Sequence, residues 1–406
     1  MSAKRKRIGL FGLFGTGNSG NDGSLEAMLV FLRRAVPEEQ LLCICGEPGV
    51  VKEAFGVDAI PFYYRFRGAA DGRGATLLEK VVGRATLWMY AARHLRRVKV
   101  LIVPGTGVLD DFSVGPLGWP HDVLCWWTLA RLMGVKVILA SIGAGPIHHP
   151  VSRWMMKLAA RAAHYRSYRD EVSKDFMDSI GLDTRNDRIC PDIAFRLSAP
   201  SANRSLVREP DRPTIGIGVM TYQGWQNDGR RGASIYTTYL ETITEYALWL
   251  LNLGHRVRLL MGETSDRRAV ADLLHALRSR DPDLADGSIS FTPARTLHDI
   301  MEQMANLDIV VATRFHNVVC ALKLGKPTIS IGYAEKNDAL LGQVGLADFC
   351  QHIERCDLGR LKDQTARLLS DTGTLGRRIS EVRTQFEYQL REQEDAILAL
   401  VGQDDE

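Results

Sequence analysis

The side chains best suited to chemistry are an arginine and a histidine two residues apart, Arg314 and His316. They follow an apolar run that predicts a strand over 308–312 and precede one that predicts a helix over 317–324. A fixed guanidinium can hold an anionic substrate, and an imidazole that titrates near neutral pH can pass a proton to it. Because apolar flanks oblige both groups to pair or to face a cleft, we favour this role over a helix-capping histidine beside a solvated arginine.

A second arginine, Arg169, stands between a predicted strand over 165–167 and a predicted helix over 171–180. Guanidinium is suited to bidentate recognition of carboxylate or phosphate, although a plain surface ion pair is the competing interpretation. Tyr333 and Lys336 follow another predicted strand and could reach the same ligand, with a solvated loop as the alternative.

The loop after the first predicted strand has glycines at the spacing of a dinucleotide-binding fingerprint. Its other residues are unusually polar, and the helix that follows is predicted to start only at Ser24. We therefore expect Gly17, Asn18 and Gly20 to contact an anion or a substrate. An ordinary N-cap at Asp22 or Ser24 is the alternative.

Gly105 and Gly107 follow the strand predicted over 98–103, where they could contact a ligand or simply let strand and helix pack closely. A later glycine loop runs into His148 and His149, which lack partners at the spacing of a metal site. We expect chemistry without a bound metal, with an acceptor contact as a further role for these histidines.

The elements that position these residues are short apolar runs that alternate with helical patterns, which predicts parallel α/β architecture. The runs cover 8–14, 40–44, 98–103, 135–142, 214–219, 257–261, 309–312 and 328–331. Residues 197–212 lack hydrophobic periodicity and contain several prolines and serines, so they predict a linker. We expect Rossmann-like domains over 1–196 and 213–375, and a closing helix and tail over 376–406. In such proteins ligands bind beyond the carboxyl ends of the strands, here in an interdomain cleft.

The composition fits a globular protein that does not bind nucleic acid, since 51 Lys and Arg against 48 Asp and Glu leave a net charge of only +3. Seven cysteines without paired spacing favour a reducing cytoplasm. The basic N-terminus leads into a strand-like run rather than a signal peptide, and no apolar stretch is long enough to span a membrane.

Together these motifs resemble the polysaccharide pyruvyl transferase family over roughly residues 8–345. The resemblance rests on the loops at 17–20 and 105–107, Tyr168-Arg169-Asp170 with Ser173, Pro191-Asp192 with Phe195, Arg314-Phe315-His316, Lys326-Pro327 and Tyr333-x-x-Lys336. The first loop has Asn21-Asp22 where the family usually has Asp directly after the glycine, and Pro104-Gly105-Thr106-Gly107 replaces a commoner run of three glycines.

The resemblance implies a fold similar to two-domain GT-B glycosyltransferases and transfer of the enolpyruvyl group of phosphoenolpyruvate to a sugar, usually as a cyclic ketal. Arg314 and His316 would then bind the donor and supply acid chemistry, Arg169 would be a second anion-binding arginine, and Asn18 the first-loop asparagine. Phosphoenolpyruvate would be a substrate, with no separate cofactor. The acceptor would belong to an exopolysaccharide or cell-surface glycan precursor, of the kind carried on polyprenyl diphosphate.

Two other interpretations remain open. A GT-B glycosyltransferase that uses a nucleotide sugar would share this architecture, with Glu335 contacting a ribose. A non-catalytic sugar-binding protein would leave Arg314 and His316 without a chemical role.

Residues 62–99 hold nine basic residues against Asp71 and Glu79, interleaved with aromatic side chains. This pattern suits the surface of an anionic bilayer, and it predicts an enzyme that works in the cytoplasm, peripherally bound to the inner face of the membrane. The competing interpretation is a core stripe formed by Leu77, Val81, Trp88 and Leu95 with solvated arginines outside it.

Overall fold

The computed structural model describes residues 6–63, 77–200, 212–226, 229–285 and 287–402. Arg65, Arg67 and Arg73 of the basic segment, most of the predicted linker and the tail after 402 lie outside these ranges. The chain divides into two compact units. Unit 1 comprises Met1–Thr16, Ser24–Ile193 and Leu390–Glu406, and unit 2 comprises Gly17–Gly23 and Ala194–Gln389.

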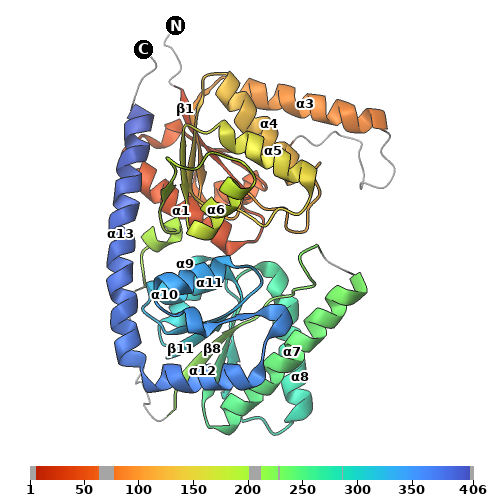
Figure 1. Cartoon of the computed structure of the whole chain (residues 1–406), viewed down its shortest axis with the longest axis vertical. Coiled ribbons are helices and arrows are strands. Elements are labelled where there is room, and N and C mark those ends of the chain that lie inside the picture. Colours follow the sequence, from red (N-terminus) through yellow and green to blue (C-terminus); the bar gives the residue numbers. More distant parts are fainter. Residues whose placement is uncertain (1–5, 64–76, 201–211, 227–228, 286, 403–406) are drawn as a thin grey trace. The chain divides into compact units, whose positions relative to one another are not determined.

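Unit 1 is built on a parallel sheet with the described strand order β3-β2-β1-β4-β5-β6-β7. The strands are β1 (Arg7–Phe11), β2 (Leu41–Cys45), β3 (Ala59–Pro61), β4 (Val98–Pro104), β5 (Lys136–Ile142), β6 (Tyr165–Tyr168) and β7 (Arg188–Ile189). The helices are α1 (Ser19–Leu32), which begins in unit 2, then α2 (Pro48–Phe55), α3 (Leu77–Leu95), α4 (Trp119–Leu132), α5 (Pro150–Arg161) and α6 (Glu171–Ser179). They lie on both faces of the sheet, as Figure 1 shows.

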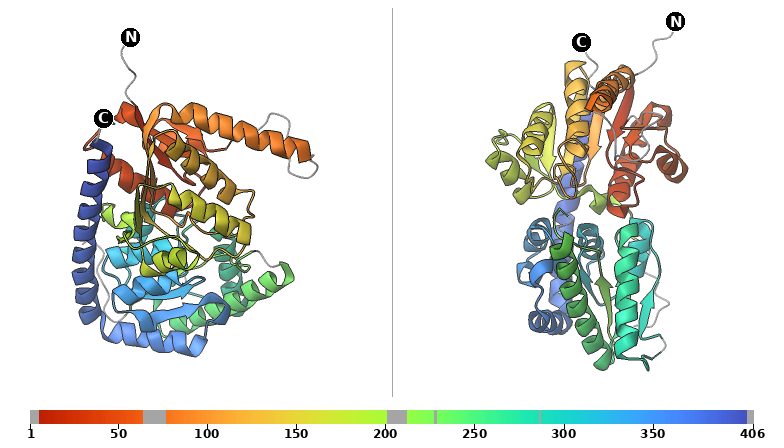
Figure 2. Two further views of the ribbon diagram at one scale, coloured as in Figure 1. Left: turned by 45° about the horizontal axis from the view of Figure 1, so that its top comes forward. Right: turned by 90° about the vertical axis from the view of Figure 1, so that its right-hand side faces the viewer.

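Unit 2 repeats the plan with the described strand order β10-β9-β8-β11-β12-β13, again parallel. Its strands are β8 (Thr214–Gly218), β9 (Arg256–Leu260), β10 (Ile289–Phe291), β11 (Ile309–Ala312), β12 (Thr328–Gly332) and β13 (Cys350–His352). Its helices are α7 (Gly229–Asn252), α8 (Arg267–Arg280), α9 (Leu297–Met304), α10 (Phe315–Lys323), α11 (Lys336–Gln343) and α12 (Leu358–Ser370). Figure 2 shows helices on both faces of this sheet.

The predicted doubly wound α/β class is confirmed, because in each sheet the strand order reverses beside the first strand of its unit. The central strands carry the cores. In unit 1, Phe11 stacks on Trp119 at 5.6 Å between ring centroids, and the Trp126 indole N–H donates to the Phe62 carbonyl at 2.7 Å.

The predicted closing helix is present as α13 (Thr372–Gly402), which contributes residues to both units. Gln393 joins the core of unit 1, where its amide donates to the Ser141 hydroxyl at 2.9 Å. In unit 2 the Phe386 ring packs against Phe195. None of the described helices combines the length and hydropathy of a membrane-spanning segment.

Candidate functional site

The end of β11 is fixed by Thr313, whose buried hydroxyl donates to the Gly218 carbonyl at 2.8 Å. Gly218 is the last residue of β8, so this bond joins the two strands at the point where the strand order reverses. The Asn337 amide donates to the Thr313 carbonyl at 3.3 Å and to the Ser330 hydroxyl at 2.9 Å, which fixes the end of β12 as well. The segment that carries Arg314 and His316 therefore starts from a rigid support.

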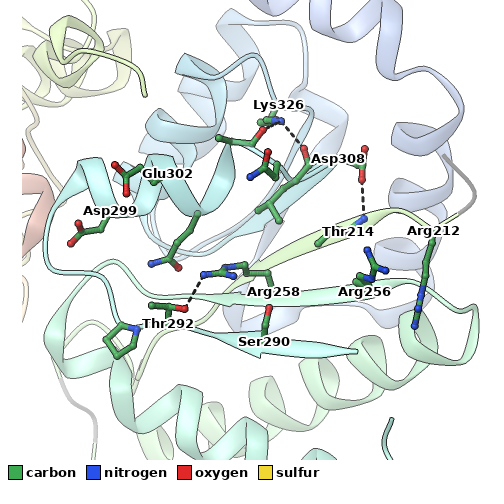
Figure 3. Close-up of a pocket in the computed structure, with 15 residues that line it drawn as sticks. Arg212, Thr214, Arg256, Arg258, Ser290, Thr292, Asp299, Glu302, Asp308 and Lys326 are labelled. Carbon is green, nitrogen blue, oxygen red and sulfur yellow. Dashed lines mark hydrogen bonds between the residues drawn. The ribbon is translucent and has the colours of Figure 1, made fainter. Parts of the chain in front are cut away.

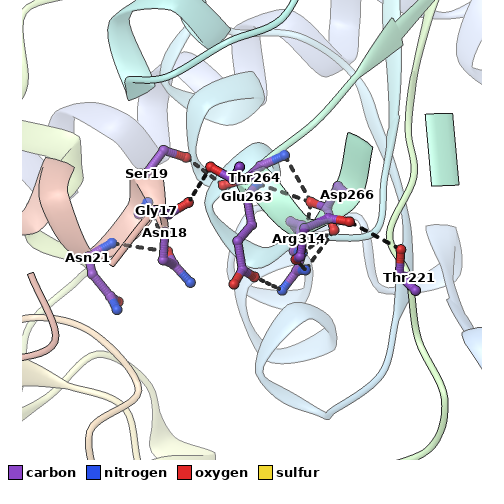
Figure 4. A network of polar contacts seen from close by, with 12 residues as sticks. Gly17, Asn18, Ser19, Asn21, Thr221, Glu263, Thr264, Asp266 and Arg314 are labelled. Atoms are coloured by element: carbon purple, nitrogen blue, oxygen red, sulfur yellow. Dashed lines mark hydrogen bonds and ion pairs between the residues drawn. The ribbon is translucent and has the colours of Figure 1, made fainter. Parts of the chain in front are cut away.

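Arg314 is the N-cap residue of α10, and its guanidinium lies between two carboxylates. Nη2 is 2.6 Å from Oδ1 of Asp266, Nε is 3.1 Å from Oδ2 of the same residue, and Nη1 is 2.7 Å from Oε2 of Glu263 (Figure 4). Burial alone lowers the pKa of Arg314, but the two acids outweigh it and hold the pKa above its ordinary value. The three groups together carry a net charge of −1.

The acids that hold Arg314 lie in the turn between β9 and α8, and the first glycine loop lies against that turn (Figure 4). The Thr264 amide donates to the Gly17 carbonyl at 3.2 Å, and the Ser19 hydroxyl donates to the Gly262 carbonyl at 2.6 Å. Asn18 forms an isolated antiparallel bridge with Glu263. The segment 17–23 thus belongs to the surroundings of Arg314.

The helix after the first loop begins at Ser19, not at Ser24 as the sequence predicts. The Asn18 side chain accepts from the amides of Gly20 at 3.0 Å and Asn21 at 3.2 Å, so Asn18, and not Asp22 or Ser24 of the alternative interpretation, caps this helix. Gly20 is therefore the second residue of α1 rather than part of an open phosphate loop.

Gly20 lies against the imidazole of His316. A Cβ atom added at Gly20 would stand 1.9 Å from Nδ1 of His316, well inside van der Waals contact. His316 is in the first turn of α10 and half-buried, with its ring edge-on to Phe315. The structure thus brings Gly17, Asn18, Gly20, Arg314 and His316 together within unit 2.

Tyr333 and Lys336 meet at the carboxyl end of β12, where the ammonium group lies 4.7 Å from the centre of the tyrosine ring. Tyr333 also packs with Tyr222 and Trp225, which follow β8, at 5.7 and 6.3 Å between ring centroids. Tyr222 is buried, at 2% exposed, whereas Trp225 and Tyr333 are half-buried, so only the latter two could offer a ring face to a ligand.

Arg169 lies in unit 1 at the carboxyl end of β6, and 5% of the residue is exposed. It too stands between carboxylates, with Nε 3.5 Å from Oδ2 of Asp170 and Nη1 3.6 Å from Oδ2 of Asp192. Asp170 is fixed as the N-cap of α6 by the Ser173 amide at 2.7 Å. These distances are longer than the corresponding ones around Arg314.

The two glycine loops of unit 1 have different roles. A Cβ atom at Gly143 would lie 2.5 Å from Nη2 of Arg169, so the absence of a side chain there makes room for the guanidinium. Gly107 also borders Arg169, with 3.8 Å to the same nitrogen. Gly105, at φ +57°, instead packs against Ser24 of α1, as expected for close strand–helix packing.

His148 and His149 form part of a fixed turn. Oδ2 of the fully buried Asp111 accepts from both backbone amides at 2.9 Å, and Nδ1 of His149 accepts from Val151 at the start of α5. Within the described ranges, no three potential ligands gather as a metal site would require.

Sequence reasoning missed the two carboxylates that surround Arg314, Glu263 and Asp266. The available signal was their place just after a predicted strand, with the three-residue spacing of a capping box, which the structure shows. It also missed Tyr222 and Trp225, which follow the first strand of unit 2.

The two parallel doubly wound units define a protein of the GT-B class. In fold the chain is similar to MnaA of S. aureus, solved with UDP, at a TM-score of 0.60 and 12% identity, covering 93% of this chain and 91% of that one. The UDP-GlcNAc 2-epimerase of Methanocaldococcus jannaschii has a TM-score of 0.59 and 11% sequence identity, and the match covers 93% of this chain and 99% of that one. A glycosyltransferase from Rickettsia africae has a TM-score of 0.58 and 10% sequence identity, and the match covers 99% of this chain and 100% of that one. No curated protein matches the sequence.

The chain belongs to the polysaccharide pyruvyl transferase family, whose family model matches residues 18–335. It is therefore a transferase, and the predicted family is confirmed.

Proposed function

We propose that this transferase moves the enolpyruvyl group of phosphoenolpyruvate onto a sugar of an exopolysaccharide or cell-surface glycan precursor and forms a pyruvate ketal. The observation that carries the proposal is the arrangement of Arg314 and His316 at the start of α10, with the imidazole seated on Gly20. Membership of the family supports it.

The proposed reaction needs a proton donor. His316 would protonate the methylene carbon of the donor, and the cationic centre that results would be attacked by one sugar hydroxyl, whose proton is released. A second hydroxyl would then displace phosphate and close the ketal ring, so that donor and diol give ketal and inorganic phosphate. General acid catalysis of the first step suits an imidazole near neutral pH.

The anionic donor needs positive charge, and Arg314 alone does not provide a surplus because Asp266 and Glu263 already surround it. The backbone amides at the start of α10 supply a second favourable field, since a helix N-terminus attracts anions. Arg169 would be a further anion-binding residue, because a guanidinium suits bidentate recognition of a carboxylate or phosphate.

The half-buried rings of Trp225 and Tyr333, with Lys336 beside them, would receive a sugar ring. An acceptor built on a polyprenyl diphosphate would bring the enzyme to the cytoplasmic face of a membrane. Unit 1 supports such a contact, because Arg93, Arg96 and Arg97 at and just after the end of α3 are exposed. The aromatic residues near them, Trp88 and Tyr90, pack against the core instead.

Calorimetric titration tests the proposal against a nucleotide-sugar enzyme in which Glu335 would contact a ribose. Phosphoenolpyruvate should bind and nucleoside diphosphates should not. The reverse result would favour the glycosyltransferase, and a result in which neither ligand binds would favour a non-catalytic protein.

His316→Ala should lower turnover by about 10²–10⁴-fold in a folded protein. Arg314→Ala and Arg169→Ala should chiefly weaken donor binding. We propose that turnover persists in excess chelator; loss that one added metal restores would contradict this.

A further inference from the structure

Unit 2 contains a pocket of about 690 Å³ beside α9, which reaches from the amino ends of β8 and β9 to the residues that follow β10 (Figure 3). Thr214 and Arg256 are the first residues of β8 and β9, and Asp308 directly precedes β11. Arg314 follows the other end of β11, so the pocket is separate from the candidate site. Its volume is in the range of pockets for small molecules.

The register of the strands explains why this pocket is polar. Thr214 pairs with Arg256, and Ser290 pairs with Arg258, so these four side chains share one face of the sheet. A parallel sheet covered on both faces normally has apolar strands, and β11 and β12 are fully buried in this way. Arg256 and Arg258 on β9 depart from this pattern, because they place charged side chains on a covered sheet.

Arg258 is the central side chain of the pocket. Its Nη2 donates to the Thr292 hydroxyl at 3.0 Å (Figure 3), while its Nε is shielded from solvent and meets no acceptor. It makes no ion pair with any residue that the structure describes. Burial lowers the pKa of this guanidinium. A partly desolvated cation without a counter-ion is unfavourable, and an anionic ligand would offset that penalty.

The opposite side of the pocket is formed by α9 and offers a different chemistry. Glu302 and Gln303 line it, together with Asp299, whose Oδ2 accepts from the amides of Arg295 and Thr296. Carboxylate and amide groups are suited to binding hydroxyl groups. None of the described lining residues is aromatic, so a nucleobase would find no ring on which to stack.

We propose that this pocket binds an acidic sugar, with Arg258 receiving its carboxylate or phosphate group and the α9 side receiving its hydroxyl groups. The volume suits one or two sugar rings. The inference goes beyond pyruvyl transfer and does not depend on it, because no residue of the candidate site lines the pocket.

The test is calorimetric titration of the full chain at low salt with glucuronate, glucose 1-phosphate, glucose and inorganic phosphate. At least one acidic sugar should bind about tenfold or more tightly than glucose and than inorganic phosphate, as expected for charge-assisted contacts. The acidic sugar that binds identifies the anionic group. Amide hydrogen exchange should show protection in β9 and β10 on binding.

Arg258→Gln should weaken that binding about tenfold or more, while the matched control Arg278→Gln, on the exposed side of α8, should leave it unchanged. His316→Ala should also leave it unchanged, which separates this pocket from the candidate site. If Arg258→Gln lowers the thermal midpoint, Thr292→Val replaces it. Equal binding of glucose, equal binding of inorganic phosphate, or unchanged affinity in the pocket variants would overturn the proposal.

Discussion

Arg314 and Arg169 share an arrangement in which each guanidinium stands between two carboxylates of its own unit. Each trio has a net charge of −1, so neither arginine attracts an anion as strongly as a free guanidinium would. What the carboxylates provide is a fixed orientation, since charge-assisted hydrogen bonds hold the planar group in place. We infer that orientation, with helix N-termini supplying additional field, is the main contribution of Arg314.

The Asp266→Asn variant tests that role. Asp266 is fully buried and accepts from Arg314 as well as from the amides of Gly262 and Glu263, so the change breaks a buried pair. The free energy of unfolding should fall by about 3 kcal/mol, measured by urea denaturation. Glu263→Gln is the control, because the Glu263 side chain is 28% exposed and should cost less. Equal losses of unfolding free energy in the two variants would contradict the conclusion that Asp266 is the main partner of Arg314.

Gly20→Ala tests whether the imidazole of His316 packs against Gly20. The added methyl group would meet Nδ1 at 1.9 Å and force the imidazole to move, and a displacement near 1 Å can lower turnover by about 10²-fold. Gly83→Ala in α3 is the matched control, since nothing lies within 4 Å of its Cβ position. Steady-state kinetics should show a loss only at Gly20, and wild-type turnover there would disprove the contact.

Cys356 offers a test of pH dependence. It is the one half-buried cysteine, the other six being buried, and desolvation together with Asp357 raises its pKa to about 12. Because the thiolate is the nucleophile, alkylation by iodoacetamide at pH 8 should be about 10³-fold slower than for a free cysteine and should rise with pH up to about 12. Rapid labelling of Cys356 in the folded protein, read by mass spectrometry, would refute this.

At the scale of residues, the sequence singled out Arg314 and His316 but not the carboxylates that hold Arg314. Arg314 and His316 stand out because apolar neighbours flank them on both sides. Asp266 is 48 positions away from Arg314, and its capping-box spacing indicates a helix start but not an arginine partner. The helix start was misplaced because glycines in its first turn disfavour a helix, whereas packing on His316 requires one of them.

At the scale of elements, the central strands were predictable and the edge strands were not. The strands β1, β4, β5, β8, β11 and β12 are apolar runs that lie buried between helices. The missed strands β3, β7, β10 and β13 have two or three residues each, and all four are edge strands. Such short segments have no periodicity to detect, since their pairing is decided by the neighbouring strand.

The helix α13 was predictable from its apolar spacing, but its polar anchor was not. Gln393 is 2% exposed, and its side chain accepts from the Ser167 hydroxyl while it donates to Ser141. Gln393→Ala should lower the free energy of unfolding by about 1–3 kcal/mol, because two buried hydroxyls lose a partner. Gln385→Ala, at an exposed position of the same helix, should have little effect in the same denaturation experiment. Similar values for both would argue against the anchor.

At the scale of the whole molecule, the fold is shared with proteins whose sequences are only 10–12% identical. Such a likeness is possible because alternating buried strands and covering helices can be built from many apolar sequences. The family model matches residues 18–335, a range that includes the Arg-x-His segment and the other loops at the strand ends. Fold and family were therefore both accessible from the sequence, through different residues.

The distribution of charge is also a property of the whole chain, whose net charge of +3 conceals a local +7 over residues 62–99. The described part of this segment exposes arginines and Met89. In α5, Val151, Trp154 and Leu158 are exposed at helical spacing, with Arg153 and Arg161 beside them. The helices α3 and α5 both pack against α4, so basic and apolar side chains are exposed on neighbouring helices of unit 1.

We therefore expect the protein to sediment with anionic liposomes and not with neutral ones, and to be released by salt, because each basic residue near an anionic surface contributes about 1 kcal/mol. Replacing Arg93, Arg96 and Arg97 by Ser should weaken sedimentation severalfold at low salt. The same change at Arg268, Arg278 and Arg280 of α8 removes equal charge from unit 2 and should have a smaller effect. Equal binding to neutral vesicles, or equal losses in the two triple variants, would exclude the α3 arginines as an electrostatic membrane contact.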